Sequence, residues 1–210
     1  MADFRLRVTY AKTGRLVMLS HLEICHALER AVRRADLPYA VSQGFSPHMK
    51  LSFGSALPVG VGGDQEIFDV NLTEYVDPQE ALSRLVQSSP EDLAPLTCTY
   101  VTRDVPAASV MYPLSTYQVH FSGDPSGLVL PDEVVVTRKR KERRFDPREY
   151  LVGDIQISGT NMVFTLESKP EGSLRADVLI QEMTNGTDLQ VLSIKRIRQA
   201  AYAGSTGFVG

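Results

Sequence analysis

The sequence has only two cysteines, Cys25 and Cys98, no tryptophan and no long apolar run. Two thiols in unlike contexts cannot supply a disulfide framework, an iron–sulfur cluster or a four-ligand zinc site. No stretch approaches the roughly 20 apolar residues that span a bilayer, and the first residues lack the apolar block of a signal peptide. We therefore expect a cytoplasmic protein with no cofactor, no metal and no membrane partner, in which both cysteines are small buried side chains.

Catalytic motifs are also missing. Residues 60–63 form a Gly-rich stretch without a following helix or Lys-Ser/Thr pair, so they predict a turn and not a phosphate-binding loop. No Gly-x-Ser-x-Gly elbow occurs, and His21 and His26 miss the i, i+4 spacing of a helical metal pair. A self-sufficient enzyme is therefore not expected.

The chain has 210 residues, of which 43% are hydrophobic and 22% charged, as is typical of a globular protein. Its net charge of −3 conceals a strong segregation. Residues 1–60 have eight Lys/Arg against four Asp/Glu, whereas residues 61–110 have two against nine. Six further basic residues lie within residues 138–144. This asymmetry indicates a local anion-facing surface on an acidic protein.

Apolar periodicity predicts an α+β domain over residues 1–105. Alternation predicts strands, and spacings of three and four predict helices. Ser20 and Glu23 form a capping box, and Asp77-Pro78 is a helix start. The expected order is a strand over 4–10, a helix from 20 to 37, strands at 50–53 and 66–72, a helix from 77, and a strand at 96–101. This βαββαβ order is that of a ferredoxin-like sandwich with both helices on one face, which leaves Arg5 and Arg7 on the other, free face.

The apolar spacing also predicts which side chains are buried. The expected buried positions are Leu22, Cys25, Leu28, Val32 and Ala35 in the first helix, Ala81, Leu82, Leu85 and Val86 in the second, and Phe68, Val70 and Leu72 in the strand between them. Asp69 and Asn71 then point outward.

After a connector at 106–114, residues 115–203 predict a second, smaller α+β domain, and 204–210 a loose tail. Strands are expected at 117–121, 134–138, 155–158, 162–166 and 189–197, with a helix at 174–183. Strands again surround a helix, so a degenerate repeat of the first half is one interpretation, although no residue-level repeat supports it.

A dense polar loop lies within residues 42–54. His48, Lys50 and Ser52 share one strand face, and Gly44 and Pro47 favour a turn with a fixed backbone conformation. One interpretation is that the loop and the first-helix arginines hold an anion or an RNA backbone. The other is that Phe45 fills the core and the polar side chains are merely solvated. The sequence leaves both open.

The basic run at 138–144 favours a phosphate-bearing partner, because each neutralised phosphate releases counterions. With the loop and the first helix it defines the expected anion- or RNA-binding surface: Lys12, Arg15, Arg30, Arg33, Arg34, Ser42, Gly44, Phe45, His48, Lys50, Arg138, Lys139, Arg140, Lys141, Arg143 and Arg144. His21 and His48 are the only catalytic candidates, as in metal-independent RNA cleavage.

Residues 5–60 resemble a bacterial family of radical-SAM-linked proteins, a domain of unknown function. The matching residues are Lys12, Gly14, Leu19-Ser20-His21-Leu22, Arg30-Ala31, Arg33-Arg34-Ala35, Leu37-Pro38, Ser42, Gly44-Phe45, Pro47-His48, Lys50 and Phe53. Glu23, His26 and Met49 depart from the family pattern. The resemblance implies association with a radical-SAM enzyme. This chain has no Cys-x3-Cys-x2-Cys triad, so it is not that enzyme itself.

Three functions remain open. The first is an accessory module that binds RNA or another anionic partner for a radical-SAM enzyme. The second is a metal-independent RNA-processing enzyme that uses His21 or His48. The third is a pure protein-interaction module that docks through the acidic residues of 61–110.

Overall fold

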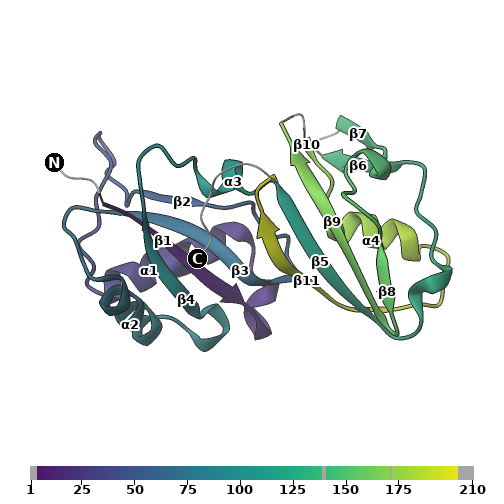
Figure 1. Ribbon diagram of the computed structural model, residues 1–210, viewed down its shortest axis with the longest axis horizontal. Helices are drawn as coiled ribbons and strands as arrows, with labels where there is room; N and C mark the ends of the chain where they lie inside the picture. Colours follow the sequence, from purple (N-terminus) through teal and green to yellow (C-terminus); the bar gives the residue numbers. More distant parts are fainter. Residues whose placement is uncertain (1–3, 139–140, 171, 203–210) are drawn as a thin grey trace. The chain divides into compact units, whose positions relative to one another are not determined.

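The computed structural model describes residues 4–138, 141–170 and 172–202. Within them the chain forms two compact units, one ending at Tyr112 and the other spanning Pro113–Tyr202 (Figure 1). Each unit is a mixture of helices and antiparallel strands, as expected for the α+β class. The expected tail at 204–210 lies outside the described residues.

The first unit is a four-stranded antiparallel sheet in the order β2-β3-β1-β4. Its elements are β1 (Phe4–Lys12), α1 (His21–Arg34), β2 (Leu51–Phe53), β3 (Val61–Leu72), α2 (Pro78–Ser88), β4 (Pro95–Val101) and the short α3 (Ala108–Met111), with 3-10 turns η1 (Gly14–Met18) and η2 (Glu91–Leu93). Each predicted strand and helix of this half is therefore present, with shifts of a few residues at the ends.

Both predicted helix starts are confirmed. The Ser20 hydroxyl accepts from the Glu23 N–H while the Glu23 carboxylate accepts from the Ser20 N–H, which completes the capping box of α1. Asp77 accepts from the N–H groups of Gln79 and Glu80 at the start of α2. These caps satisfy orphan donors that each helix would otherwise leave unpaired.

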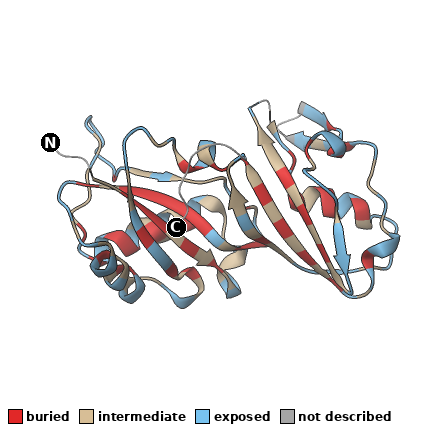
Figure 2. Cartoon of the chain, viewed as in Figure 1, coloured by how far each residue is buried: buried red, intermediate tan, exposed pale blue. Residues whose placement is uncertain are grey.

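A single core lies between the sheet and α1 and α2. Leu6, Val8, Phe68 and Val70 have no exposed surface, and Figure 2 shows the buried residues running along β1 and β3. Leu28 of α1 packs in the same cluster.

Two predicted core positions are wrong. Leu22 is 64% exposed and Val86 is 49% exposed. In α1 the unpredicted Ile24 and Ala31 are buried, and Cys25, also predicted to be buried, is only partly so. At 3.6 residues per turn, Leu22 lies about 160° around the helix from the buried Ile24 and about 120° from Leu28. Leu22 therefore cannot share the buried stripe of α1.

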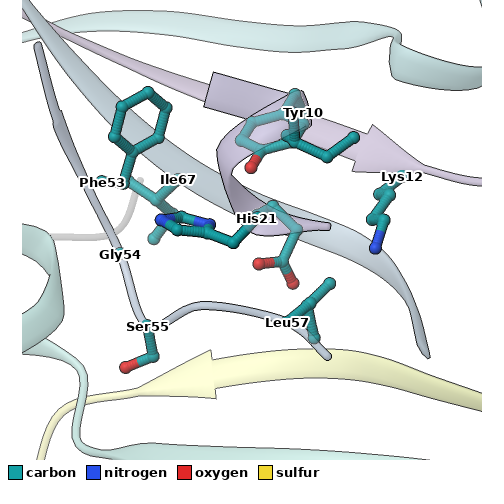
Figure 3. A pocket seen from close by; sticks show the side chains of 10 residues that line it. Tyr10, Lys12, His21, Phe53, Gly54, Ser55, Leu57 and Ile67 are labelled. Atoms are coloured by element: carbon teal, nitrogen blue, oxygen red, sulfur yellow. The ribbon is translucent and has the colours of Figure 1, made fainter. Parts of the chain in front are cut away.

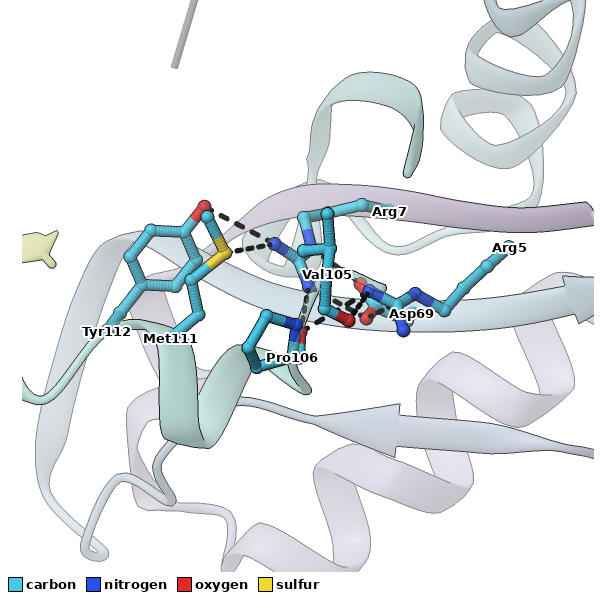
Figure 4. Close-up of polar contacts among 7 residues, drawn as sticks. All are labelled: Arg5, Arg7, Asp69, Val105, Pro106, Met111 and Tyr112. Carbon is cyan, nitrogen blue, oxygen red and sulfur yellow. Dashed lines mark hydrogen bonds and ion pairs between the residues drawn. The ribbon is translucent and has the colours of Figure 1, made fainter. Parts of the chain in front are cut away.

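The sheet face opposite the two helices was expected to be uncovered. It is instead covered where Arg7 and Asp69 lie. Arg7 is 6% exposed and Asp69, predicted to point outward, is fully buried. The connector covers them: Pro106, Met111 and Tyr112 lie over the pair (Figure 4). The short helix α3 contacts β2 and β3, so the connector is part of the first unit's packing.

The second unit has a sheet in the order β10-β9-β5-β11, with β8 on β9, and a separate two-stranded antiparallel sheet of β6 and β7. Its elements are β5 (Leu114–Phe121), β6 (Val134–Arg138), β7 (Lys141–Phe145), β8 (Gln156–Ser158), β9 (Asn161–Lys169), β10 (Gly172–Ser173), α4 (Ala176–Thr184) and β11 (Val191–Ala200), with 3-10 turns η3 (Pro125–Gly127) and η4 (Pro147–Glu149). The strands β7 and β10 were not predicted, because charged residues dominate the first and the second is only two residues long.

The alternation predicted for β5 is confirmed, since Tyr117, Val119 and Phe121 are buried. In α4 the buried residues are Ala176, Leu179, Ile180 and Met183. Across the described parts of both units, no helix is long and apolar enough to cross a membrane.

Candidate functional site

A small pocket lies at one end of the first unit's sheet, beside the start of α1. Its walls come from the end of β1, the first turn of α1, the chain after β2, and β3. Figure 3 shows the His21 ring pointing into the space between Phe53, Lys12, Ser55 and Leu57. The pocket has about 280 Å³ of space when its open mouth is included. Tyr10 and Glu66 complete its polar lining.

Two charged side chains occupy core positions in this pocket. Lys12 continues the inward alternation of Leu6, Val8 and Tyr10 and is 2% exposed. Glu66 begins the alternation of Phe68 on β3 and is 3% exposed. Lysine and glutamate are almost never fully buried unless they are paired or hydrogen-bonded. The ammonium of Lys12 is held by the Leu19 carbonyl at 3.0 Å and the Pro58 carbonyl at 3.4 Å.

The sequence suggested that Lys12 contributes to an open basic surface. The structure shows that it does not. It forms part of the pocket wall together with His21, the other predicted functional residue at this place.

Gly63 fits closely against Glu66. Lys12 and Gly63 are Cα partners across β1 and β3. A Cβ added at Gly63 would lie 2.4 Å from Oε1 of Glu66, which is far inside van der Waals contact. The Glu66 carboxylate therefore lies against the backbone directly opposite Lys12, and only glycine leaves it that space.

His21 packs edge-on against Phe53, with ring centroids 5.6 Å apart. Its Nε2 lies 3.5 Å from Sγ of Cys25, one helical turn later. Burial raises the pKa of the Cys25 thiol, and burial raises that of Cys98 to about 12. Both thiols are therefore protonated at neutral pH, and Cys25 with His21 does not form an activated nucleophile.

The loop at 41–49 forms a second candidate site. Val41 and Met49 form an isolated antiparallel bridge. The Ser42 hydroxyl lies 2.8 Å from Nδ1 of His48 and accepts from the His48 N–H at 3.1 Å. Gly44 adopts a φ of +139°, a conformation that favours glycine. The loop thus has internal hydrogen bonds at its base.

Phe45 is fully exposed in that loop. The interpretation in which Phe45 fills the core is therefore wrong. Met49 is 4% exposed and takes that inward role, while His48 and Lys50 are exposed. Phe45 thus exposes an aromatic ring in the same loop as the exposed His48.

The arginines predicted on α1 are at the surface. Arg30, Arg33 and Arg34 are all exposed, and Arg33 forms an i, i+4 ion pair with Glu29 at 2.8 Å. Arg15 is exposed in η1, where its backbone N–H donates to the Asp92 carboxylate. An exposed pair such as Arg33–Glu29 is weak, so these guanidinium groups remain accessible to an anion.

The basic run of the second unit is partly neutralised. Arg143 and Arg144 are exposed on β7, and Arg144 pairs with Glu133 at 2.5 Å and with Glu142 at 3.9 Å. Lys139 and Arg140 lie outside the described residues, as do the side chains of Arg138 and Lys141.

The structure thus gathers the predicted residues of the first unit into a pocket with Lys12 and His21 and a loop with Ser42, Gly44, Phe45 and His48. The sequence analysis missed Tyr10, Ser55 and Glu66 of the pocket. The available signal was a charge where the alternation of β1 and β3 calls for an apolar residue. No group of three His, Cys, Asp or Glu side chains suited to a metal occurs among residues 4–138, 141–170 and 172–202.

Comparison with protein families gives one match. Residues 5–184 match a family described as an uncharacterized protein conserved in bacteria (DUF2344). No curated protein matches the chain.

Proposed function

Because the chain belongs to this uncharacterized family of bacterial proteins (DUF2344), we propose that it is a cytoplasmic accessory protein that binds RNA for a partner enzyme of the radical-SAM class. The radical-SAM partner rests on the resemblance of residues 5–60, and RNA binding rests on the exposed side chains of the first unit.

The observation that carries RNA binding is the fully exposed ring of Phe45. Aromatic rings at the surface provide stacking platforms for unpaired bases, and each stacked base contributes about 1–3 kcal/mol. His48 and Lys50 are exposed close by in the chain and supply groups for the phosphate backbone. A stacking ring next to cationic groups is the combination that single-stranded nucleic acid requires.

The exposed arginines of α1 support the same partner. Arg30, Arg33 and Arg34 add positive charge to an otherwise acidic protein. Arginine presents a planar fork of donors that matches phosphate oxygens. An anionic partner gains from all three.

The acidic stretch at 61–110 fits a protein-docking face less well. Of its nine acidic residues, Glu66 and Asp69 are buried, Asp77 caps α2 and Glu80 pairs with Arg84. Fewer of these charges are therefore available to a partner than the sequence suggested.

The arrangement of the first unit also supports a ferredoxin-like interpretation of residues 1–105. Its strand order β2-β3-β1-β4, its antiparallel pairs and the shared core of α1 and α2 are those of a βαββαβ sandwich. Such folds host many unrelated functions, so the fold by itself does not support RNA binding.

The test is retention of single-stranded RNA on filters across a salt series. Neutralising Arg33→Gln with Arg34→Gln should weaken binding and reduce the slope of log affinity against log salt by about 1.4, or about 0.7 for each lost phosphate contact. The control is Arg84→Gln with Arg103→Gln, which removes the same charge from two other arginines of this unit. Binding that is absent at low salt would refute the proposal, as would equal losses in both double variants.

A second candidate function, metal-independent RNA processing, is favoured by the position of His21 in the pocket with Lys12. It predicts turnover of RNA by the purified protein that His21→Ala abolishes. Turnover that His48→Ala abolishes instead would assign the reaction to the loop.

A further inference from the structure

The loop at 41–49 holds the His48 ring by one of its two nitrogens. Nδ1 lies 2.8 Å from the Ser42 hydroxyl and 3.4 Å from the carbonyl oxygen of Ser46. A carbonyl oxygen only accepts hydrogen bonds, whereas a hydroxyl oxygen can accept two. One lone pair of the Ser42 hydroxyl accepts from the His48 N–H at 3.1 Å, which leaves the other for the ring. A hydrogen on Nδ1 satisfies both oxygens, so the loop favours that tautomer.

The other ring nitrogen, Nε2, is then a hydrogen-bond acceptor. A neutral imidazole carries one hydrogen, so Nε2 presents a lone pair when Nδ1 donates. His48 is exposed, and in the part of the chain that the structure describes its hydrogen bonds involve only Nδ1 and the backbone. The loop thus offers an acceptor at the surface on a ring whose opposite edge is held in place.

The fully exposed Phe45 ring lies in the same loop. Ser42 and His48 face each other across the base of the loop, where the Ser42 N–H donates to the His48 carbonyl at 2.8 Å. Three residues span at most about 11 Å, so a short stretch of one nucleic-acid strand can contact both Phe45 and His48. Residues 41–50 contain no carboxylate that would repel its phosphates.

A single acceptor selects a donor on that strand. Phosphate oxygens are acceptors, and the amino groups of bases stand beside acceptors, so that they are read by two-point contacts. The ribose 2′-hydroxyl can donate, occurs at every nucleotide of RNA and is absent from DNA. We propose that Nε2 of His48 accepts a hydrogen bond from a ribose 2′-hydroxyl, so that this loop selects RNA over single-stranded DNA. This selection rests on the proposed function, because only a bound strand presents its hydroxyl to the loop.

The test compares an RNA and a DNA strand of one sequence made only of adenine and cytosine, so that the 2′-hydroxyl is their sole difference. In filter retention, the whole protein should bind the RNA about fivefold more tightly, the effect of one hydrogen bond between neutral groups. His48→Asn keeps an amide at the distance of Nδ1 for Ser42 and Ser46 but has no Nε2. It should bind both strands with the affinity that the wild type has for DNA.

His26→Asn is the matched control, because His26 is an exposed histidine of α1 outside the loop, and it should keep the wild-type preference for RNA. Ser42→Ala removes one of the two oxygens that hold Nδ1 and should reduce the preference. It keeps the test decisive if His48→Asn fails to fold, which circular dichroism would reveal.

Three results would overturn the proposal. The first is equal affinity of the wild type for the two strands, and the second is an undiminished preference for RNA in a folded His48→Asn or Ser42→Ala variant. The third is an equal loss of RNA and DNA affinity in His48→Asn, which would assign the hydrogen bond to a base or a phosphate.

The same measurements distinguish this proposal from the proposed function. If the wild type retains RNA and DNA equally well, selection by the 2′-hydroxyl is refuted while RNA binding stands. If the wild type retains neither strand at low salt, RNA binding is refuted and the selection of RNA with it.

Discussion

Arg7 and Asp69 form a buried, two-point ion pair across β1 and β3. Nε of Arg7 donates to Oδ1 of Asp69 at 2.7 Å and Nη2 donates to Oδ2 at 2.9 Å. The two residues are direct Cα partners in the sheet. Burial lowers the pKa of Arg7, but the hydrogen bonds and charge of Asp69 outweigh it and raise that pKa overall. The guanidinium also donates to the Tyr112 hydroxyl at 3.3 Å, so the pair ties the connector to the sheet.

Removing one member of this pair should be strongly destabilising. Asp69→Asn leaves the Arg7 guanidinium buried without its counter-charge, and the free energy of unfolding should fall by about 3–5 kcal/mol. Replacing both residues, with Arg7→Met and Asp69→Val, removes the unpaired charge and should restore most of that loss. Urea unfolding followed by circular dichroism measures each variant.

The control for the ion pair is Glu80→Gln, which breaks the exposed Arg84–Glu80 pair on α2. It should cost about 0.3–0.5 kcal/mol. A loss in Asp69→Asn no larger than this would show that burial adds nothing to the Arg7–Asp69 pair.

Most elements of the first unit could be predicted because their signals are local. The capping box at Ser20 and the Asp77-Pro78 start involve residues within one turn of each other. Burial of Asp69 could not be predicted, because it depends on Tyr112 and Pro106, which are distant in the sequence. Alternation identifies the two faces of a strand but does not show what covers the second face.

The candidate site was predicted only in part for the same reason. Lys12 and His21 were selected by residue type, whereas their meeting with Glu66 depends on the register of β1 against β3. Exposure of Phe45 could not be decided from the loop sequence, because Met49 and Phe45 are both apolar candidates for the inward position. In the structure Met49 is 4% exposed and Phe45 is fully exposed.

The capping box of α1 should make the free energy of unfolding depend on pH in the acidic range. Hydrogen bonds from the Ser20 hydroxyl and N–H lower the pKa of Glu23 below its ordinary value of 4.5. Because the folded pKa is the lower one, this contribution is complete above about 4.5 and is lost as pH falls through the folded pKa. Glu23→Gln should therefore be less stable than wild type at pH 7, and the difference should shrink below pH 4.5.

Urea unfolding over a pH series tests this capping prediction. Glu74→Gln, at an exposed position outside any helix, is the control and should keep the pH dependence of the wild type. A constant gap between Glu23→Gln and wild type from pH 7 to pH 3 would contradict the proposed role of the Glu23 charge.

Gly63→Ala should disturb the pocket through Glu66. The new Cβ would lie 2.4 Å from Oε1 of Glu66, so the carboxylate must move away. We expect a loss of about 1–3 kcal/mol in the free energy of unfolding, as for an overpacked core. Gly127→Ala is the control, since a Cβ there meets nothing within 4 Å. Equal stability of the two variants would show that Glu66 relocates without cost.

Phe45→Ala should weaken RNA binding without changing the stability of the fold. The ring is fully exposed, so its removal should change the free energy of unfolding by less than about 0.5 kcal/mol. If the ring stacks on a base, RNA binding should weaken by about 1–3 kcal/mol, with an unchanged salt slope because no phosphate contact is lost. Val110→Ala, at another exposed apolar side chain of this unit, should leave both quantities unchanged.

Filter retention and urea unfolding on the same preparations make the comparison. A large loss of stability in Phe45→Ala would show that the ring packs against the fold, and RNA binding at wild-type affinity would remove Phe45 from the interface.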